Sequence, residues 1–411
     1  MSVLRSVTSR GLDPRVVLRT AMPALLLLAG CAGTQTLHPM PYAADRLFLD
    51  RHTRILELPA GTGALLVAPD LQGRVMTACV DTDGASLGFV HRAPFAADAD
   101  ENVPFRNYGG SERFWIGPES GPYALFFEPA SPHERSQWRV PQDLDTGRFT
   151  WERTEEGVRM HREIALTNVR GTRFDMTVLR DVQPLDVAAA ESLVGTIPAG
   201  TQWTGWSTET VVANIGDAPW TRDGGLPCVW VIGMFAPGDD AWVIAPFRPG
   251  HADPDGGPPV RTDYFGEVPP DRFRTGDGFA VFRADARAEG KIGVLRDRAR
   301  DRIAAWDPDT GVLTVVFFGP IDRDAPYLSE RWGESLENPY YGDVANAYNS
   351  GSDPFFELES SSPALELAPG GRHLHRHITL HLRPSGGVAL ETLVRGALGL
   401  AWQDVQDLID A

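Results

Sequence analysis

Short apolar or alternating runs, each bounded by Gly, Pro, Asp or Asn, recur along the chain from Thr53 onward. Runs of this length between turn residues are typical of strands in an antiparallel sandwich or barrel. The 42 glycines and 33 prolines are scattered rather than gathered in repeats, as many tight turns between strands require. The clearest runs are ALLVAPDL, GRVMTACV, YALFFEPA, RFDMTVLRDV, CVWVIGMF, AWVIAPF, GVLTVVFF, PFFELESSS and RHLHRHITLHL. The sequence therefore predicts an all-β fold.

Helix signals are few by comparison. The three candidates are Val187–Leu193, Val294–Trp306 and Trp402–Ile409. No fixed-period repeat is visible, which disfavours a propeller or a solenoid. No shift in composition marks a boundary either, so we expect a single β-rich domain over residues 46–411.

The N-terminus has a basic opening, an apolar run from Ala21 to Leu28, and the string LAGC ending at Cys31. The run is too short to span a bilayer and has the size of a signal-peptide hydrophobic region. LAGC resembles the bacterial lipobox, in which the cysteine thiol is lipidated and the preceding peptide is removed. We therefore expect residues 1–30 to be a lipoprotein signal peptide, and residues 31–45 to be a lipidated tether. Several acyl chains on one residue hold a protein stably to a membrane.

The lipobox indicates where the protein is located, and the net charge limits which partners it can have. No aspartate follows Cys31, which by resemblance favours the outer membrane, facing the periplasm or the cell surface. The net charge is −17, and loss of the four arginines and one aspartate in residues 1–30 makes it −20. Such an acidic body repels phosphate backbones, so nucleic acid is not an expected partner. Cys79 and Cys228 are flanked by apolar residues and are expected to be buried thiols rather than a disulfide.

Two early segments combine residues that a plain strand or turn does not need. Arg74 follows a glycine turn in QGRVMT, and the segment 107–119 contains Arg113, Trp115 and Glu119 after the pair Gly109-Gly110. Tryptophan faces stack on sugar rings, while arginine and carboxylates hydrogen-bond to hydroxyl groups. Paired glycines permit a close backbone approach. A turn with a salt bridge and a core tryptophan explains the second segment equally well.

A late segment carries an acidic alternation. On a strand, Glu357, Glu359 and Ser361 share one face and Phe356 and Leu358 the other. Carboxylates two residues apart on one strand lie about 7 Å from each other. If both are shielded, each raises the pKa of the other, which lets an enzyme keep one as acid and one as base. A solvated polar face explains the same alternation without chemistry. Tyr348 and Asn349 precede this strand and are further candidates for ligand contacts.

A second alternation places His373, His375, His377 and His381 on one strand face. Imidazoles in this pattern can bind a metal or transfer protons. The spacing matches no zinc signature, so a metal-free face is expected, with His375 and His377 available to a ligand. The sequence also lacks a G-x-S-x-G elbow, a P-loop, a dinucleotide fingerprint and an H-E-x-x-H motif. We therefore expect no metal and no cofactor.

Taken together, QGRVMT, YGGSERFWIGPE, YFGEVP, GDVANAYNSG and FFELESSSPALELAPGG resemble an uncharacterised family of bacterial lipoproteins. Its relatives in turn resemble the galactose mutarotase (aldose 1-epimerase) superfamily. Gly109-Gly110 resembles the His-Gly-Gly turn of mutarotases, and Glu359 (or Glu357) resembles their late-strand glutamate. The resemblance implies a large antiparallel β-supersandwich with few short helices, whose concave face binds carbohydrate.

The epimerases of that superfamily use a glutamate as base and a histidine as acid, and this sequence departs from them in two places. Tyr108 stands where a histidine precedes the paired glycines, and the segment 213–217 lacks the histidine that would follow its asparagine. We therefore predict a carbohydrate-binding envelope lipoprotein, with epimerase-, hydrolase- or lyase-like activity left open. The alternatives are a non-catalytic glycan-binding lipoprotein of a polysaccharide-uptake system and a structural envelope lipoprotein.

We expect the candidate residues to converge on one pocket, each with its own role. Either Glu357 or Glu359 is the acid or base, Arg74 and Arg113 orient hydroxyl groups, and Trp115 is the stacking platform. The remaining expected ligand contacts are Glu119, Tyr348, Asn349, His375 and His377. One of the two glutamates should approach Arg74, Arg113 or Trp115 in space and should have a raised pKa.

Overall fold

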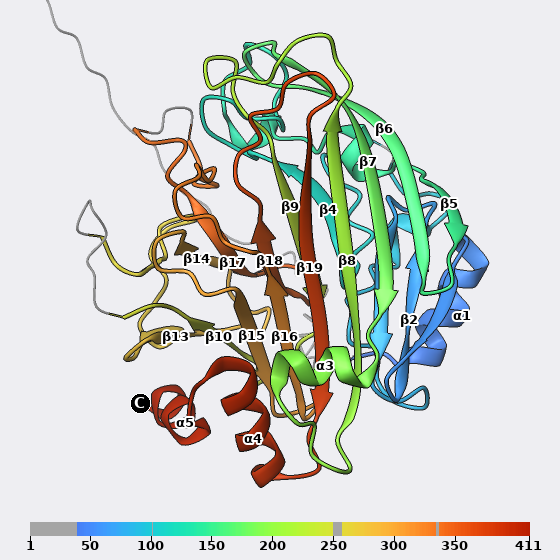
Figure 1. Ribbon diagram of the computed structural model, residues 1–411, viewed down its shortest axis with the longest axis vertical. Coiled ribbons are helices and arrows are strands. Elements are labelled where there is room, and N and C mark those ends of the chain that lie inside the picture. Colours follow the sequence, from blue (N-terminus) through green and yellow to red (C-terminus); the bar gives the residue numbers. More distant parts are fainter. Residues whose placement is uncertain (1–38, 101, 250–256, 334–336) are drawn as a thin grey trace, which may run out of the picture. The chain divides into compact units, whose positions relative to one another are not determined.

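The structure is a computed structural model that describes residues 39–100, 102–249, 257–333 and 337–411. These described residues form one compact unit. Its named strands pair only antiparallel, in three sheets (Figure 1). The predicted fold class, an antiparallel β-supersandwich with few short helices, is confirmed. The predicted signal peptide and most of the tether, including Cys31, lie outside the described residues.

The six-stranded sheet carries the site described below. Its order is β11 (Val260–Arg261), β14 (Gly290–Leu295), β17 (Asp343–Asn349), β18 (Phe356–Ser361), β9 (Cys228–Phe235) and β4 (Arg113–Gly117). β4 comes from the first third of the chain and β18 from the last fifth, and β9 pairs with both. This pairing brings together the two segments that the sequence singled out.

The ten-stranded sheet covers one face of the six-stranded sheet. Its order is β12 (Phe273–Thr275), β13 (Phe279–Arg283), β10 (Trp242–Pro246), β15 (Arg302–Asp307), β16 (Val312–Phe318), β19 (Arg372–Arg383), β8 (Gln202–Asn214), β7 (Arg173–Pro184), β6 (Val158–Thr167) and β5 (Thr150–Arg153). Successive side chains on a strand point to opposite faces. Phe356 and Leu358 of β18 therefore pack against Val316 of β16, between the sheets.

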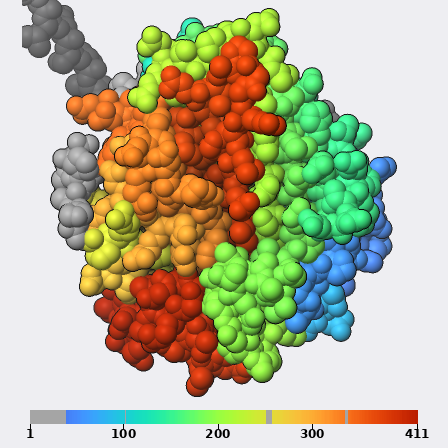
Figure 2. All heavy atoms as spheres, viewed as in Figure 1, coloured from blue at the N-terminus to red at the C-terminus, as the bar shows by residue number. Residues whose placement is uncertain are grey.

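The outer face of the ten-stranded sheet is covered at one end by helices. Leu380 and Leu382 of β19 pack there with α3 (Val187–Val194), α4 (Gly387–Leu398) and α5 (Trp402–Asp410). Figure 2 shows these helices, in green and red, at the lower end of that face. The three-stranded sheet β1 (Leu56–Ala60), β2 (Gly63–Ala68) and β3 (Arg74–Cys79) packs under α1 (Tyr42–His52). A single-turn helix, α2, spans Gln142–Asp145.

A buried polar cluster lies between the two large sheets. The guanidinium of Arg180 on β7 donates to Glu112 Oε1 over 2.6 Å. Trp206 Nε1 and Thr208 Oγ1 donate to the other oxygen of the same carboxylate, at 2.8 and 2.9 Å. Both members of the ion pair are 0% exposed. Because buried charges are costly unless paired, Arg180 and Glu112 depend on each other.

Several predicted elements differ from the observed ones. The predicted helices at Val187–Leu193 and Trp402–Ile409 are confirmed as α3 and α5. The one at Val294–Trp306 is wrong, because this segment spans the end of β14, a turn and β15, whose apolar residues fill two sheet faces. YALFFEPA is irregular rather than a strand, although its residues 124–127 are buried in the core.

Three α-helices of the described residues were not predicted: α1, α4 and the single turn α2. α1 begins at Tyr42, inside the expected tether, because Tyr42 is buried and its hydroxyl donates to Glu57 over 3.0 Å. The tether expected over residues 31–45 is therefore wrong for its last residues. α4 begins at Gly387, the second of two paired glycines, and also contains Gly396. Glycine is a weak helix former, so these residues gave little helix signal. A Cβ on Gly396 would lie 1.9 Å from the carbonyl oxygen of Val194, so this glycine lets α3 and α4 pack closely.

Candidate functional site

A cavity of about 350 Å³ opens on the face of the six-stranded sheet that the ten-stranded sheet leaves free. Its floor is made of alternate residues from five adjacent strands, as the two-residue period of a strand requires. Glu357 on β18 lies between its cross-strand partners Met234 and Tyr348, and Trp115 on β4 lies opposite Trp230 on β9. The floor residues are Arg113, Trp115, Trp230, Ile232, Met234, Lys291, Tyr348 and Glu357.

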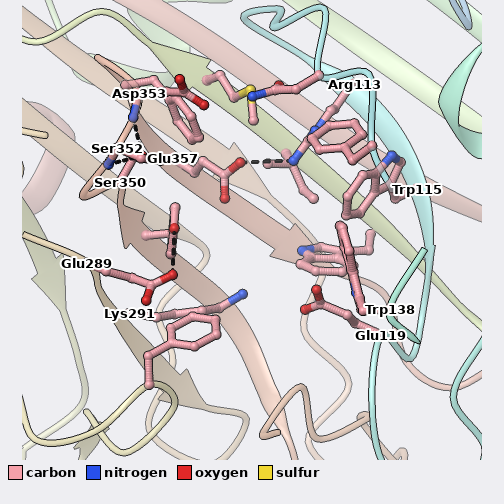
Figure 3. Close-up of a pocket in the computed structure, with 18 of the residues that line it drawn as sticks. Arg113, Trp115, Glu119, Trp138, Glu289, Lys291, Ser350, Ser352, Asp353 and Glu357 are labelled. Atoms are coloured by element: carbon pink, nitrogen blue, oxygen red, sulfur yellow. Dashed lines mark hydrogen bonds and ion pairs between the residues drawn. The ribbon is translucent and has the colours of Figure 1, made fainter. Parts of the chain in front are cut away.

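The walls of the cavity come from loops and strand ends. They carry aromatic rings and further charged or polar groups: Phe105, Asn107, Glu119, Arg135, Trp138, Phe265, Glu289, Trp332, Ser350, Ser352, Asp353 and Phe355. Figure 3 shows the charged groups Arg113, Lys291, Glu119 and Glu357 around one space, beside Trp115 and Trp138. Flat apolar surfaces and hydrogen-bonding groups therefore face the same small volume.

Glu357 and Arg113 form the central ion pair of the floor. Arg113 Nη2 donates to Glu357 Oε1 over 2.9 Å, and the guanidinium stacks 4.1 Å from the centre of the Trp115 ring. Burial raises the pKa of Glu357 well above its ordinary range, against the opposing effect of Arg113. The Nε and Nη1 atoms of Arg113 have no hydrogen-bond partner in the described part of the chain. This pair thus places a protonatable carboxyl at the floor, fixed by a guanidinium whose other N–H groups are covered by the surrounding protein.

Glu359 lies two residues further along the same face but is withdrawn from the cavity. It is fully buried, and its Oε2 accepts hydrogen bonds from Trp230 Nε1 and Lys291 Nζ, each over 2.9 Å. Burial alone would lower the pKa of Lys291, but the neighbouring Glu359 and Glu119 outweigh it and raise that pKa. Lys291 therefore stays charged and holds Glu359 beneath the floor.

Glu330 supports the wall from behind. Its Oε2 accepts a hydrogen bond from the backbone N–H of Glu119 over 3.0 Å, so it fixes the turn that carries Glu119. There is no room for a side chain at Gly117, whose Cβ would lie 2.4 Å from Glu330 Oε1. Burial raises the pKa of Glu330 to about 8, and burial also raises the pKa of Glu119.

The raised pKa of Glu330 predicts a pH-dependent stability. Between its ordinary pKa of 4.5 and about 8, the folded chain keeps the proton that the unfolded chain releases. The free energy of unfolding should therefore fall as the pH rises through this window, by up to about 1.4 kcal/mol per pH unit. Glu330→Gln cannot ionise and should be more stable than the wild type at pH 8 in urea denaturation. Equal slopes of stability against pH for the two proteins would contradict this.

The structure brings together half of the ten site residues that the sequence singled out. Arg113, Trp115, Glu119, Tyr348 and Glu357 all line the cavity. The expected approach of a late glutamate to Arg113 is present, although 244 residues separate Glu357 from Arg113 in the chain. The expected rise in pKa falls on Glu357. The geometry therefore selects Glu357 rather than Glu359 as the carboxyl that faces a ligand.

Two expected ligand contacts point elsewhere. Arg74 is fully buried, and its terminal nitrogens donate to the carbonyl oxygens of Gly109 and Asp145, at 2.8 and 3.0 Å. It holds the glycine turn rather than a hydroxyl group. Asn349 ends β17 on the face opposite to Tyr348, where it accepts from the N–H of Ala286 over 2.8 Å. It shapes a turn and does not line the cavity.

His375 and His377 also lie away from the cavity. The shared histidine face of β19 points between the two sheets, where Ser360 Oγ bonds to His375 Nε2 at 2.9 Å and to His377 Nδ1 at 2.8 Å. Burial lowers the pKa of both imidazoles to about 3, which keeps them neutral. Ser360 is on the face of β18 opposite to Glu357, so the sheet itself separates these histidines from a ligand.

Several cavity residues were not found from the sequence. Lys291 is a single lysine in the apolar run GKIGVL, and that isolated charge was the available signal. Trp230 lies in the alternation CVWVIGMF, where the face of each residue could have been assigned. Trp138 and Trp332 lie in irregular segments without any period. Among the described residues, no group of three or more His, Cys, Asp or Glu side chains is arranged to hold a metal ion.

Cys79 and Cys228 are both buried free thiols, as expected. Cys228 lies under the wall, with its sulfur 4.0 Å from Glu330 Oε1, and burial raises its pKa well above the ordinary value. A thiol is nucleophilic only as the thiolate. Cys228 is therefore not a nucleophile of this site.

Solved structures similar to the chain include proteins of the superfamily that the motifs resembled. A galactose mutarotase-like protein from Clostridium acetobutylicum is 13% identical, with a TM-score of 0.46, over 80% of this chain and 99% of that one. The Slr1438 protein from Synechocystis sp. PCC 6803 is 13% identical, with a TM-score of 0.48, over 80% of this chain and 96% of that one. No curated protein matches the chain in sequence. Residues 40–409 match the model of a family of unknown function.

Proposed function

Because the chain belongs to DUF6786, a family of unknown function, its role has to be inferred from its own pocket, and we propose that this pocket binds a carbohydrate. The observation that carries the proposal is the combination of aromatic faces with charged hydrogen-bonding groups around one small volume. Trp138 and Trp332 are half-buried and offer flat apolar surfaces for the C–H face of a sugar ring, whereas Trp115, the expected stacking platform, is buried under the Arg113 guanidinium. Glu357, Glu119 and Asp353 offer hydrogen-bonding groups for its hydroxyl groups. A cavity of about 350 Å³ is at the small end of the about 300–1,000 Å³ usual for ligand sites, which suits one or two sugar units.

We further propose that Glu357 transfers a proton to or from the bound sugar. A carboxyl with a raised pKa keeps its proton near neutral pH and can donate it to a ring or glycosidic oxygen. Arg113 fixes the orientation of the carboxyl, which is the kind of positioning that general acid–base catalysis needs. The reaction class, whether epimerisation, hydrolysis or elimination, is left to product analysis.

One observation favours the alternative of a non-catalytic glycan-binding protein. The second carboxylate of the strand, Glu359, is tied to Lys291 and Trp230 below the floor and does not reach a ligand. If Glu119 on the wall does not serve as the partner acid or base, the pocket can bind a sugar without converting it.

The binding proposal is tested with a glycan array and calorimetry on the detergent-solubilised full-length chain. For any sugar that binds the wild type, Trp138→Ala should lower the affinity at least tenfold, about 1.4 kcal/mol. The reason is that the sugar loses the ring on which it stacks. Trp306→Ala is a matched control, since Trp306 is similarly half-buried but packs against Trp402 on the far side of the ten-stranded sheet. Absence of binding to every glycan would refute the proposal and favour a structural role in the envelope.

We also propose that the domain is held at a membrane through lipid on Cys31, in the outer membrane and facing the periplasm or the surface. The support is the LAGC string after a short apolar run. In the described part of the chain, no helix is both long and apolar enough to cross a bilayer. Cys31→Ser should abolish labelling by a clickable palmitate and partitioning into detergent. Label that persists in Cys31→Ser would refute the anchor.

A further inference from the structure

The pocket has more carboxyl groups than cations to pair with them. Each of its three cations already holds a carboxylate: the pairs are Arg113–Glu357 at 2.9 Å, Lys291–Glu359 at 2.9 Å and Arg135–Glu289 at 2.8 Å. An ion pair of this kind leaves little net charge for a ligand to meet. Any preference of the pocket for a charged ligand therefore depends on the groups that remain.

Two lining carboxylates remain, Glu119 and Asp353. Neither forms an ion pair with a cation of the described residues, although both line the cavity. Glu119 is the more enclosed of the two. It stands beside Trp138 on the wall and faces the space shared by Lys291 and Glu357 (Figure 3). The ion-paired carboxylates balance the three cations, so Glu119 and Asp353 add negative charge to the pocket whenever they are ionised.

We propose that the sugar recognised by this pocket carries a protonated amine, which pairs with Glu119 and lies against Trp138. This inference rests on the proposed carbohydrate function and adds the charge of the ligand. An ammonium group near Glu119 gains a carboxylate partner in an enclosed site, where charge pairs are weakly screened. The face of Trp138 also attracts cations. One group of the ligand would satisfy both neighbours.

The same arrangement disfavours acidic sugars. A uronic acid would bring its carboxylate among Glu119, Asp353 and Glu357, and like charges at an interface are a source of discrimination. Arg113 does not offset this, because Glu357 already occupies one of its nitrogens. Its other N–H groups are covered by the surrounding protein.

The test compares three 2-amino-2-deoxyhexoses with their parent hexoses and with two uronic acids. Binding of glucosamine, galactosamine and mannosamine, of glucose, galactose and mannose, and of glucuronic and galacturonic acid is measured by calorimetry on the detergent-solubilised full-length chain. At neutral pH and low salt, at least one amino sugar should bind about tenfold tighter than its parent hexose, and the uronic acids should bind most weakly. Added salt should reduce the preference.

The variant Glu119→Gln keeps the size of the side chain and removes its charge. It should reduce the affinity ratio of the amino sugar to its parent hexose to about one. Glu209→Gln is the control for total charge, because Glu209 pairs with Arg376 on an exposed face of the ten-stranded sheet. It should leave the ratio unchanged.

The other outcomes are equally decisive. Hexoses that bind as tightly as amino sugars, or uronic acids that bind more tightly, would overturn the amine while the carbohydrate proposal stands. A ratio that survives Glu119→Gln would also overturn the assignment. Choline, a cation that is not a sugar, is added as a further probe. If no sugar binds, whether or not choline binds, the carbohydrate proposal fails and the amine inference fails with it.

Discussion

Arg180→Met should lower the free energy of unfolding by about 3–5 kcal/mol, the largest loss that we expect from one side chain of this protein. Arg180 and Glu112 are both 0% exposed and are joined by an ion pair of 2.6 Å. Without Arg180, the carboxylate of Glu112 keeps only the hydrogen bonds from Trp206 and Thr208. Burial already raises the pKa of Glu112, so the unpaired group must either remain charged in an apolar core or take up a proton.

Urea denaturation at neutral pH measures this loss. Arg159→Met is a matched control on the adjacent strand, because Arg159 pairs with Asp181 at 2.8 Å but its side chain is 47% exposed. Exposed pairs contribute about 0–1 kcal/mol. The double variant Arg180→Met with Glu112→Met should recover much of the stability, since it removes both charges. Similar losses for Arg180→Met and Arg159→Met would show that the buried pair has no special role.

Glu357→Gln should reduce the turnover of any sugar that the wild type converts by about 10²–10⁴-fold, the usual contribution of a general acid or base. The amide keeps an oxygen for the hydrogen bond from Arg113, so folding and sugar binding are expected to persist. NMR detection of anomeric exchange and product analysis measure the loss. Unchanged turnover in Glu357→Gln would exclude the carboxyl from the reaction.

The pH profile tests the same residue independently. Because burial raises the pKa of Glu357, its protonated form persists to a higher pH than that of an ordinary glutamate. Activity that needs protonated Glu357 should fall as the pH rises through this raised pKa. The residual activity of Glu357→Gln should not show that fall. Glu359→Gln provides the comparison. It should chiefly disturb the buried Lys291, so its main effect is expected on stability rather than on the pH at which activity falls.

The all-β class could be predicted because each strand shows its own pattern. Alternation in PFFELESSS correctly separates Glu357 and Glu359 from Phe356. The helix prediction for Val294–Trp306 was wrong because its apolar residues fill two sheet faces, so that their spacing also fits a helix. Such a conflict is settled only by the neighbouring strands with which β14 and β15 pair.

The site was less predictable, because a strand pattern groups residues by face without saying what that face meets. The histidines of β19 share a face, as predicted, yet this face meets Ser360 between the sheets. Arg74 and Arg113 look alike in sequence, each following a glycine turn by a few residues, but one holds Gly109 and the other holds Glu357. Only the order of strands in the sheet decides between these outcomes.

The division of the pocket into a sheet floor and loop walls has a consequence for how its selectivity can change. Glu357, Arg113 and Lys291 are fixed by strand pairing that also holds the core together, so their exchange affects folding. Glu119, Trp138 and Asp353 lie in connecting segments outside the regular strands. Segments of this kind tolerate insertion and substitution far better than core strands do. Changes in these wall segments can therefore alter which ligand the pocket accepts without disturbing the sheet floor or the fold.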